Sequence, residues 1–172
     1  MAQAVVSTER SSKALIDKEG KYLTFALGAE EYGLEIRKVR EIIGYMAITA
    51  IPQTPGHVKG VINLRGQVIP VVDIRTLFGM NAMDVTEETC IVVVEISQKN
   101  RAFSTGVIVD RVSEVLDIKG EQIEEAPQLG ASVNTDFILG MGKVNDSVKI
   151  LLNIDKVLDC SGLDTIGENT VA

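Results

Sequence analysis

Apolar and polar residues alternate along much of the chain, in short runs that are separated by turn-forming residues. The alternation is clear over residues 21–27 and, after a glycine, again over residues 32–36. A two-residue period places apolar side chains on one face of a β-strand, so these two runs predict a first hairpin. Counted in this way, the chain holds about nine or ten short strands and two short helices, a pattern typical of small barrels or sandwiches. We predict an all-β fold of two small barrels packed together.

A second hairpin, followed by a short helix, is predicted further along the chain. Two runs rich in β-branched residues, 61–64 and 68–72, flank a tip that contains a glycine, and glycine supplies the positive φ of a tight turn. Asp73 then stands where a helix N-cap belongs, and Gly79 where the helix ends. Pro70 has no N–H to donate, so its strand is predicted to be an edge strand or to be bulged there.

The same pattern recurs 80 residues later. Residues 140–158 align with residues 60–78 without a gap, and Asn153 takes the place of the capping Asp73. The stretches before the two hairpins also match, at an offset of 73 residues. We therefore predict two related halves, and the sequence leaves open whether they exchange strands. The halves lie at 21–79 and 90–160, between flexible tails at 1–20 and 161–172.

Three connecting segments differ in character. Residues 90–96 form a nearly continuous apolar run, which predicts a strand buried on both faces between two cores. Residues 119–135 contain Pro127 and three glutamates, and we predict an irregular excursion there. After Ile36 the spacing of apolar residues fits a helix or a strand equally well.

Charge and composition argue against several classes of partner. The chain has 24 acidic and 17 basic residues, a net charge of −7, whereas a nucleic-acid binder needs a basic stripe. The same acidity argues against direct binding to an anionic membrane surface, and no apolar run approaches the ~20 residues that span a bilayer. Residues 1–20 lack the apolar stretch of a secretory signal. We expect a cytoplasmic protein with reduced cysteines.

Candidate catalytic and metal-binding groups are few. His57 is the single histidine of the chain, and the two cysteines, Cys90 and Cys160, form no CxxC motif. This composition predicts neither a zinc site nor a disulfide scaffold. The sequence also lacks a glycine-rich phosphate loop and a nucleophile elbow. Aspartates at predicted strand ends offer paired carboxylates, but turns and caps use Asp routinely, so we expect no enzyme activity and no cofactor. These aspartates are Asp73, Asp110 and Asp117.

Two charged residues lie within the apolar β segments. Glu41 stands between Val39 and Ile42, and Arg65 lies at the tip of the second hairpin. Each is interpreted either as an ordinary solvated residue or as half of a pair that rims a hydrophobic groove. In the second case the pair would decide partner choice and orientation more than stability.

Several motifs occur in a fixed order: EYGLEI at 31–36, VREI at 39–42, NLRGQVIPVVDIR at 63–75 and ILLNI at 150–154. This ordered set resembles the CheW family of bacterial chemotaxis coupling proteins, over about residues 22–158. The resemblance implies two intertwined five-stranded barrels of the Src-homology-3 type, with short helices and a hydrophobic groove between the barrels. It also implies that the protein is not an enzyme.

The resemblance further implies partners and contact residues. Proteins of this family bridge the cytoplasmic helical tips of chemoreceptors to the regulatory domain of the histidine kinase CheA, and they build rings with that domain in membrane receptor arrays. By matching position, the receptor-binding residues are Val39, Glu41, Gly60, Arg65 and Cys90. The kinase-binding residues are expected in the excursion, at Ile123, Glu124 and Leu129. This sequence has Glu124, Glu125 and Leu129 where other members can carry basic and aromatic residues, which weakens the expectation for that contact.

Two alternatives of other classes remain beside this adaptor function. One is a sensor that binds a small molecule in the inter-barrel groove, and the other is an enzyme that uses the carboxylates. The family module is also fused to a receiver domain in CheV and to a kinase in CheA. The 172 residues leave no room for either, so we expect a stand-alone coupler; whether it self-associates is left open.

Overall fold

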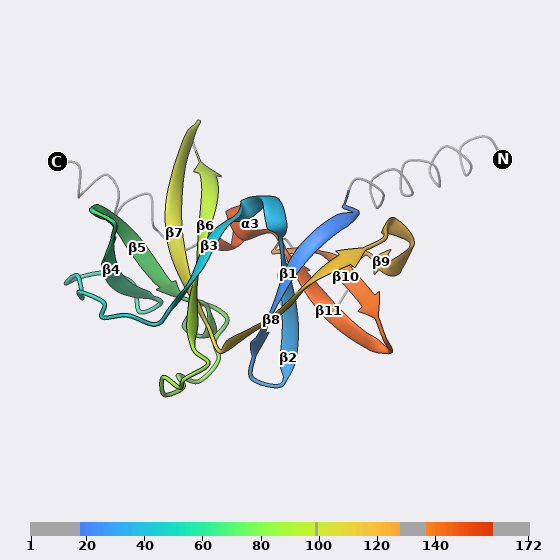
Figure 1. The fold of residues 1–172 in the computed structure, drawn as a ribbon, viewed down its shortest axis with the longest axis horizontal. Helices are drawn as coiled ribbons and strands as arrows, with labels where there is room; N and C mark the ends of the chain where they lie inside the picture. The colour runs from blue at the N-terminus through green and yellow to red at the C-terminus, as the bar shows by residue number, and fades with distance from the viewer. Residues whose placement is uncertain (1–17, 99, 128–136, 160–172) are drawn as a thin grey trace.

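The computed structural model describes residues 18–98, 100–127 and 137–159, and these consist mostly of strands in two sheets (Figure 1). The predicted all-β class, with two small barrels and short helices, is confirmed, except that one of the two sheets has six strands and not five, because the short strand β9 is added to its end. Leu129 and Cys160 lie outside the described residues, as do residues 1–17 and 161–172 of the two predicted tails. In chain order the elements are β1 (Gly20–Leu27), β2 (Glu30–Glu35), the 3₁₀-helix η1 (Ile36–Lys38), β3 (Val39–Gly44), β4 (Val58–Leu64), β5 (Gln67–Asp73), α2 (Ile74–Leu77), β6 (Cys90–Gln98), β7 (Arg101–Val109), β8 (Arg111–Ile118), the 3₁₀-helix η2 (Gly120–Gln122), β9 (Ile123–Glu124), β10 (Ile138–Val144), β11 (Ser147–Leu152) and α3 (Ile154–Asp159).

Each sheet takes strands from both halves of the sequence. One sheet has the order β8-β1-β2-β11-β10-β9 and the other β3-β6-β7-β5-β4, and we call them the six-stranded and the five-stranded barrel. The two lie side by side in Figure 1. The chain crosses between them at η1, after β2, and crosses back between β7 and β8. The exchange of strands that the sequence left open is therefore present.

The two hairpins predicted to be related share the same register. Each has a bulge at its base, between Val58 and Gly60 in β4 and between Ile138 and Gly140 in β10. Each second strand then pairs in parallel with a strand from the other half of the chain: β5 with β7, and β11 with β2. The internal repeat is thus a repeat of hairpins, and each hairpin completes its barrel with strands from the opposite half.

The predicted helix signals are confirmed. The Asp73 carboxylate accepts a hydrogen bond from the Arg75 N–H at 3.0 Å, and Gly79 has a φ of 75° after the end of α2. The prediction for Pro70 is wrong. Strand β5 is flanked by β4 and β7, so it is not an edge strand, and the bulge of this hairpin lies in β4. Proline is tolerated because the parallel pairing with β7 begins only at Val71, so no N–H is needed from Pro70 on that side.

The largest hydrophobic core lies between the two barrels, and each barrel has a smaller core of its own. Strand β6 contributes to two of them: Val92 and Val94 pack in the shared core, whereas Ile91 and Val93 pack inside the five-stranded barrel. The prediction that this strand is buried on both faces is confirmed. Because packed side chains fill the shared core, a groove for a partner would have to lie at its margin.

The excursion predicted over residues 119–135 is more ordered than expected in its first part. It contains η2 and the two-residue strand β9, which pairs with β10 at the end of the six-stranded sheet. Residues 128–136 lie outside the described part of the chain. Among the helices that the structure does describe, none is long and apolar enough to cross a membrane.

Candidate functional site

Glu41 and Arg65 form a bidentate ion pair on the five-stranded barrel. The two guanidinium Nη atoms of Arg65 donate to the two carboxylate oxygens of Glu41, at 2.7 Å and 2.6 Å. The interpretation that these residues pair is therefore the one that the structure supports. The Arg65 side chain is 73% exposed and that of Glu41 27%, so the pair presents a guanidinium to solvent.

The pair links the two edges of the five-stranded sheet. Glu41 lies on β3 and Arg65 at the tip between β4 and β5, and β3 and β4 are the terminal strands of that sheet. Arg65 has a positive φ of 53°, and the Asn63 side chain accepts from the Gly66 N–H at 2.8 Å, which supports the turn. The bonds from Arg65 lower the pKa of Glu41, because they favour the ionised carboxylate. Two of the five N–H donors of a guanidinium are used here, so others remain for a partner.

Gly60 is buried, and its position is structural. A Cβ built on this residue would lie 1.9 Å from the Thr49 carbonyl oxygen. Thr49 and Val61 exchange two backbone hydrogen bonds of 2.9 Å, so the chain after β3 pairs with the outer edge of β4 here. Gly60 therefore lets the barrel close, and it has no side chain to offer a receptor.

Val39 and Cys90 lie at opposite ends of the β3–β6 pairing. Val39 is opposite Val94, and Cys90 is opposite Gly44. Both side chains are half-buried and pack against the core between the barrels. The structure thus places all five predicted receptor residues on one barrel, but it brings only Glu41 and Arg65 into side-chain contact.

Apolar side chains are exposed on the same barrel as the ion pair. Ile42, which follows Glu41 on β3, is 44% exposed, and Val68 on β5 is 64% exposed. Val115 and Val148 occupy the equivalent places on the six-stranded barrel and are 49% and 51% exposed. Ile42 and Glu41 are consecutive on β3, so their side chains point to opposite faces: Glu41 is opposite Val93 of the five-stranded barrel's own core, and Ile42 opposite Val92 of the shared core. An exposed aliphatic residue on the face of the shared core is typical of a surface that accepts an amphipathic helix.

The residues predicted to bind the kinase differ in their exposure. Ile123 is 1% exposed and packs inside the six-stranded barrel, so its side chain is not presented at the surface, and its part in a kinase contact stays a prediction. Glu124 is exposed and pairs with Lys143 at 2.6 Å. Leu129 lies outside the described residues. What β9 presents to a partner is its outer edge and the Glu124–Lys143 pair.

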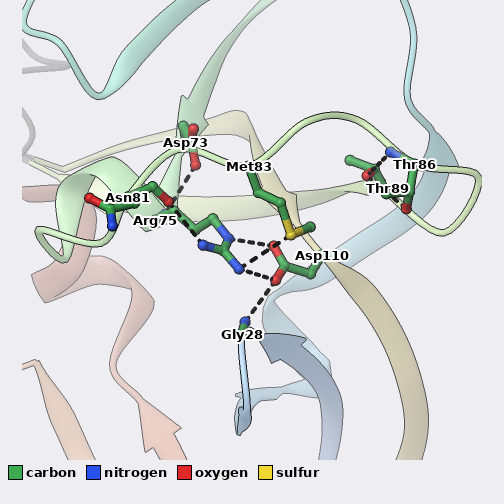
Figure 2. A network of polar contacts seen from close by, with 8 residues as sticks. All are labelled: Gly28, Asp73, Arg75, Asn81, Met83, Thr86, Thr89 and Asp110. Atoms are coloured by element: carbon green, nitrogen blue, oxygen red, sulfur yellow. Dashed lines mark hydrogen bonds and ion pairs between the residues drawn. The ribbon is translucent and has the colours of Figure 1, made fainter.

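A buried polar network that the sequence did not reveal joins the two barrels (Figure 2). Arg75 of α2 donates from Nε and Nη2 to the two oxygens of Asp110, at 2.7 Å and 2.6 Å. The Gly28 N–H, in the turn between β1 and β2, donates to the same carboxylate at 2.7 Å. Arg75 also donates to the Asn81 carbonyl at 2.9 Å. The guanidinium lowers the pKa of Asp110, and both side chains are largely buried.

The described residues contain no group of three or more His, Cys, Asp or Glu side chains that could hold a metal ion. A hollow of about 360 Å³ lies beside β1 and η1, and charged residues line much of it, including Lys18, Glu35 and Arg37. It is not an apolar groove between the barrels, so it gives the small-molecule sensor no specific support.

Comparison with known proteins matches this architecture. The family model described as "CheW-like domain" matches residues 21–161. The chain belongs to the CheW family. The chemotaxis protein CheW of Klebsiella aerogenes is 39% identical over 138 residues, which cover 80% of this chain and 81% of the relative. That of Helicobacter pylori is 33% identical with the same coverage.

The solved structures include a CheW protein of similar fold. The scaffolding protein TtCheW from Thermoanaerobacter tengcongensis superposes with a TM-score of 0.73 at 35% identity, over 82% of this chain and 93% of that one. Membership of the CheW family supports a role in chemotaxis signalling as a coupling or scaffold protein. Within that role, the Glu41–Arg65 pair and the outer edge of β9 are the candidate contact surfaces.

Proposed function

We propose that this protein couples the cytoplasmic helical tips of chemoreceptors to the regulatory domain of the histidine kinase CheA, without catalysis of its own. The observation that carries the proposal is the bidentate Glu41–Arg65 pair, which holds an exposed guanidinium at the terminal strand β3, the strand that also exposes Ile42. A receptor helix would lay its apolar face against Ile42 and the margin of the inter-barrel core. Arg65 would bind an acidic or carbonyl group of that helix and so set its register.

The kinase would bind the other barrel. Strand β9 is the terminal strand of the six-stranded sheet, so its outer backbone edge has no strand partner among the described residues. We propose this edge, with Glu124 and its partner Lys143, as part of the kinase contact. Two partners on different barrels can be bound at the same time, as coupling requires.

Weak individual contacts are sufficient for such a role. Interfaces at or below about 800 Å² per partner give modest affinities, and a lattice that links many of them raises the effective concentration of each partner. We therefore propose that the protein acts on the cytoplasmic side of the membrane, in receptor arrays where rings of couplers and kinases form. Control of the kinase would then be a small shift in contact geometry between states.

Chemical-shift mapping on isotope-labelled protein tests both surfaces. Addition of a receptor tip fragment should shift amide signals around Glu41, Ile42 and Arg65, and addition of the kinase regulatory domain should shift those of β9. The two sets should be separate, and the second fragment should still bind when the first is saturating. If neither fragment shifts any signal of the folded protein, the proposal is refuted.

Substitution at Arg65 tests the receptor surface directly. Arg65→Glu places two carboxylates together and removes the exposed guanidinium, so receptor binding should fall while binding of the kinase regulatory domain is retained. Arg40→Glu is a matched control, because Arg40 is likewise an exposed arginine of the five-stranded barrel in an ion pair, but its partner is Glu95. A large loss of thermal stability in Arg65→Glu, rather than a loss of receptor binding, would make Arg65 a structural residue.

A further inference from the structure

The Arg75–Asp110 network has a counterpart at the other crossing of the chain between the barrels. Lys38 lies in η1, where the chain passes from β2 to β3, and its Nζ donates to Asp155 Oδ2 of α3 at 2.7 Å. The Ser97 N–H, in β6, donates to the other oxygen of Asp155 at 3.1 Å. We call Arg75, Asp110 and Gly28 the α2 clamp, and Lys38, Asp155 and Ser97 the α3 clamp.

The two clamps occupy equivalent places in the internal repeat, with their charges reversed. Arg75 and Asp155 are 80 residues apart, and each is the second residue of the helix that follows a parallel-paired strand. The ion-pair partner of each lies where the chain crosses from one barrel to the other: Asp110 follows β7, and Lys38 follows β2. The cation is on the helix in the α2 clamp and on the crossing segment in the α3 clamp.

Each clamp ties one barrel to the other through a carboxylate. Asp110 accepts from Arg75, which follows the five-stranded barrel's β5, and from Gly28 in the six-stranded barrel. Asp155 follows the six-stranded barrel's β11, and it accepts from Ser97 in the five-stranded barrel. In Figure 1 the η1 crossing with α3 and the β7–β8 crossing lie at opposite ends of the junction between the barrels.

Directional bonds at two separate points add orientation to what the core between them provides. The hydrophobic effect is non-directional, and the burial of the shared core opposes separation of the barrels. Charge-assisted hydrogen bonds depend on geometry, and a bidentate guanidinium pair fixes orientation as well as distance. The side chains of the α2 clamp pair are 13% and 14% exposed, so water competes little for these bonds.

We propose that the two clamps fix the angle between the barrels, and that Arg75, Asp110, Lys38 and Asp155 are positioning residues that hold a receptor on one barrel in a defined orientation to a kinase on the other. The consequence for signalling rests on the proposed function, whereas the effect on the angle does not. Loss of a clamp would leave each binding surface intact but would weaken the transmission between them.

The angle is measured without any partner. Spin labels at Gln67 and Ser147, which lie just after the exposed tips of the two related hairpins, report the distance between the barrels in a background where Cys90 and Cys160 are replaced by serine. Lys38→Met and Arg75→Met remove one cation each and keep an unbranched side chain. We expect both to broaden the distance distribution relative to the parent protein. Lys38→Arg, which keeps the charge, should restore the narrow distribution.

Arg40→Met is the matched control. It breaks an ion pair of 2.7 Å with Glu95, but this pair joins β3 and β6 within one barrel, so the distribution should stay narrow. Circular dichroism identifies any variant that fails to fold. If Arg75→Met does not fold, the distance distributions of the Lys38 variants test the proposal alone. The α3 clamp is more exposed, so its substitution is expected to leave the fold intact. Distributions as narrow as the parent's in the folded clamp variants would overturn the proposal.

A second measurement connects the clamps to coupling. In a reconstituted receptor and kinase assay, a clamp variant should bind each partner alone as the parent does but should transmit receptor control to the kinase about fivefold less well, the lower end of typical allosteric coupling. If a broadened variant couples normally, the clamps fix the angle but do not serve signalling. If the parent protein itself binds neither partner, the proposed function fails while the distance result stands.

Discussion

Gly60→Ala is expected to damage the fold rather than a receptor contact. Gly60 has a φ of 143°, a backbone region that residues with a side chain rarely adopt, and strain of that kind costs about 1–3 kcal/mol. The added Cβ would also lie 1.9 Å from the Thr49 oxygen and 2.7 Å from its carbonyl carbon. The Thr49 segment must therefore move away, and its two hydrogen bonds with Val61 are lost, at about 0.5–1.5 kcal/mol each. The sum is a loss of roughly 2–6 kcal/mol.

Thermal and urea unfolding measure this loss, and Gly66→Ala is its control. Gly66 lies in the same hairpin with a φ of 84°, but nothing lies within 4 Å of a Cβ built there. Its substitution should lose only about 1–2 kcal/mol of unfolding free energy, from backbone strain. For a chain of this length 1 kcal/mol corresponds to about 2–4 °C, so Gly60→Ala should lower the melting temperature by roughly 10 °C.

Two results would refute this reasoning. One is a loss of stability in Gly60→Ala no larger than that in Gly66→Ala, which would mean that the segment around Thr49 yields at no cost. The other is a normal melting temperature together with a loss of receptor binding, which would make Gly60 a contact residue after all.

Three further changes test the core, the α2 clamp and β9. Thr105→Val should raise stability by about 1 kcal/mol in urea unfolding, because the Thr105 hydroxyl is fully buried and has no hydrogen-bond partner among the described residues; a loss would reveal a bound water. Asp110→Asn should lower the free energy of unfolding at neutral pH. The difference in this free energy from the parent should become smaller as the pH falls below about 4, because Arg75 lowers the pKa of the folded Asp110 carboxyl, which stabilises the fold only while it is ionised. A gap that does not depend on pH would contradict that role. Ile123→Ala should lose about 2–4 kcal/mol through a cavity, and an unchanged melting temperature would contradict the burial of Ile123.

Features set by a few neighbouring residues were predictable from the sequence. The tip of the second hairpin needs positive φ at Arg65 and Gly66, and the start of α2 needs the Asp73 carboxylate. Each depends on residues within a few positions, where turn and cap preferences act. The strand at 90–96 was predictable as well, because an unbroken apolar run has no polar face to turn toward water.

Features set by distant pairing were not predictable from these patterns. That β5 pairs in parallel with β7 of the other half, in addition to its antiparallel pairing with β4, follows from the packing of the whole chain. The clamps were missed for the same reason: Asp110 is 35 residues from Arg75, and Lys38 is 117 from Asp155. A usable signal was present in the repeat, since Arg75 aligns with Asp155, and opposite charges at equivalent helix positions point to partners of opposite sign.

The exchange of strands predicts that neither half of the chain folds alone. The six-stranded barrel takes β1 and β2 from the first half, but β8, β9, β10 and β11 come from the second. A fragment of residues 1–84 would expose the open edge of β2 and its side of the shared core. A fragment of residues 85–172 would lack two strands of the six-stranded sheet and three of the five-stranded sheet. Since the largest core joins both halves, each fragment keeps too little buried apolar surface to offset its conformational entropy.

Expression of the two fragments, separately and mixed, tests this dependence. The cut after Asp84 lies in an exposed connection and keeps the Arg75–Asn81 hydrogen bond within the first fragment, while Asp110, the acceptor of the α2 clamp, belongs to the second fragment. Each fragment alone should give an amide spectrum with the narrow dispersion of an unfolded chain, and the mixture should recover the dispersion of a β-protein. A dispersed spectrum from either fragment alone would show that a half of the sequence is an independent barrel. The parallel pairing of β5 with β7, and of β11 with β2, would then be dispensable to the fold.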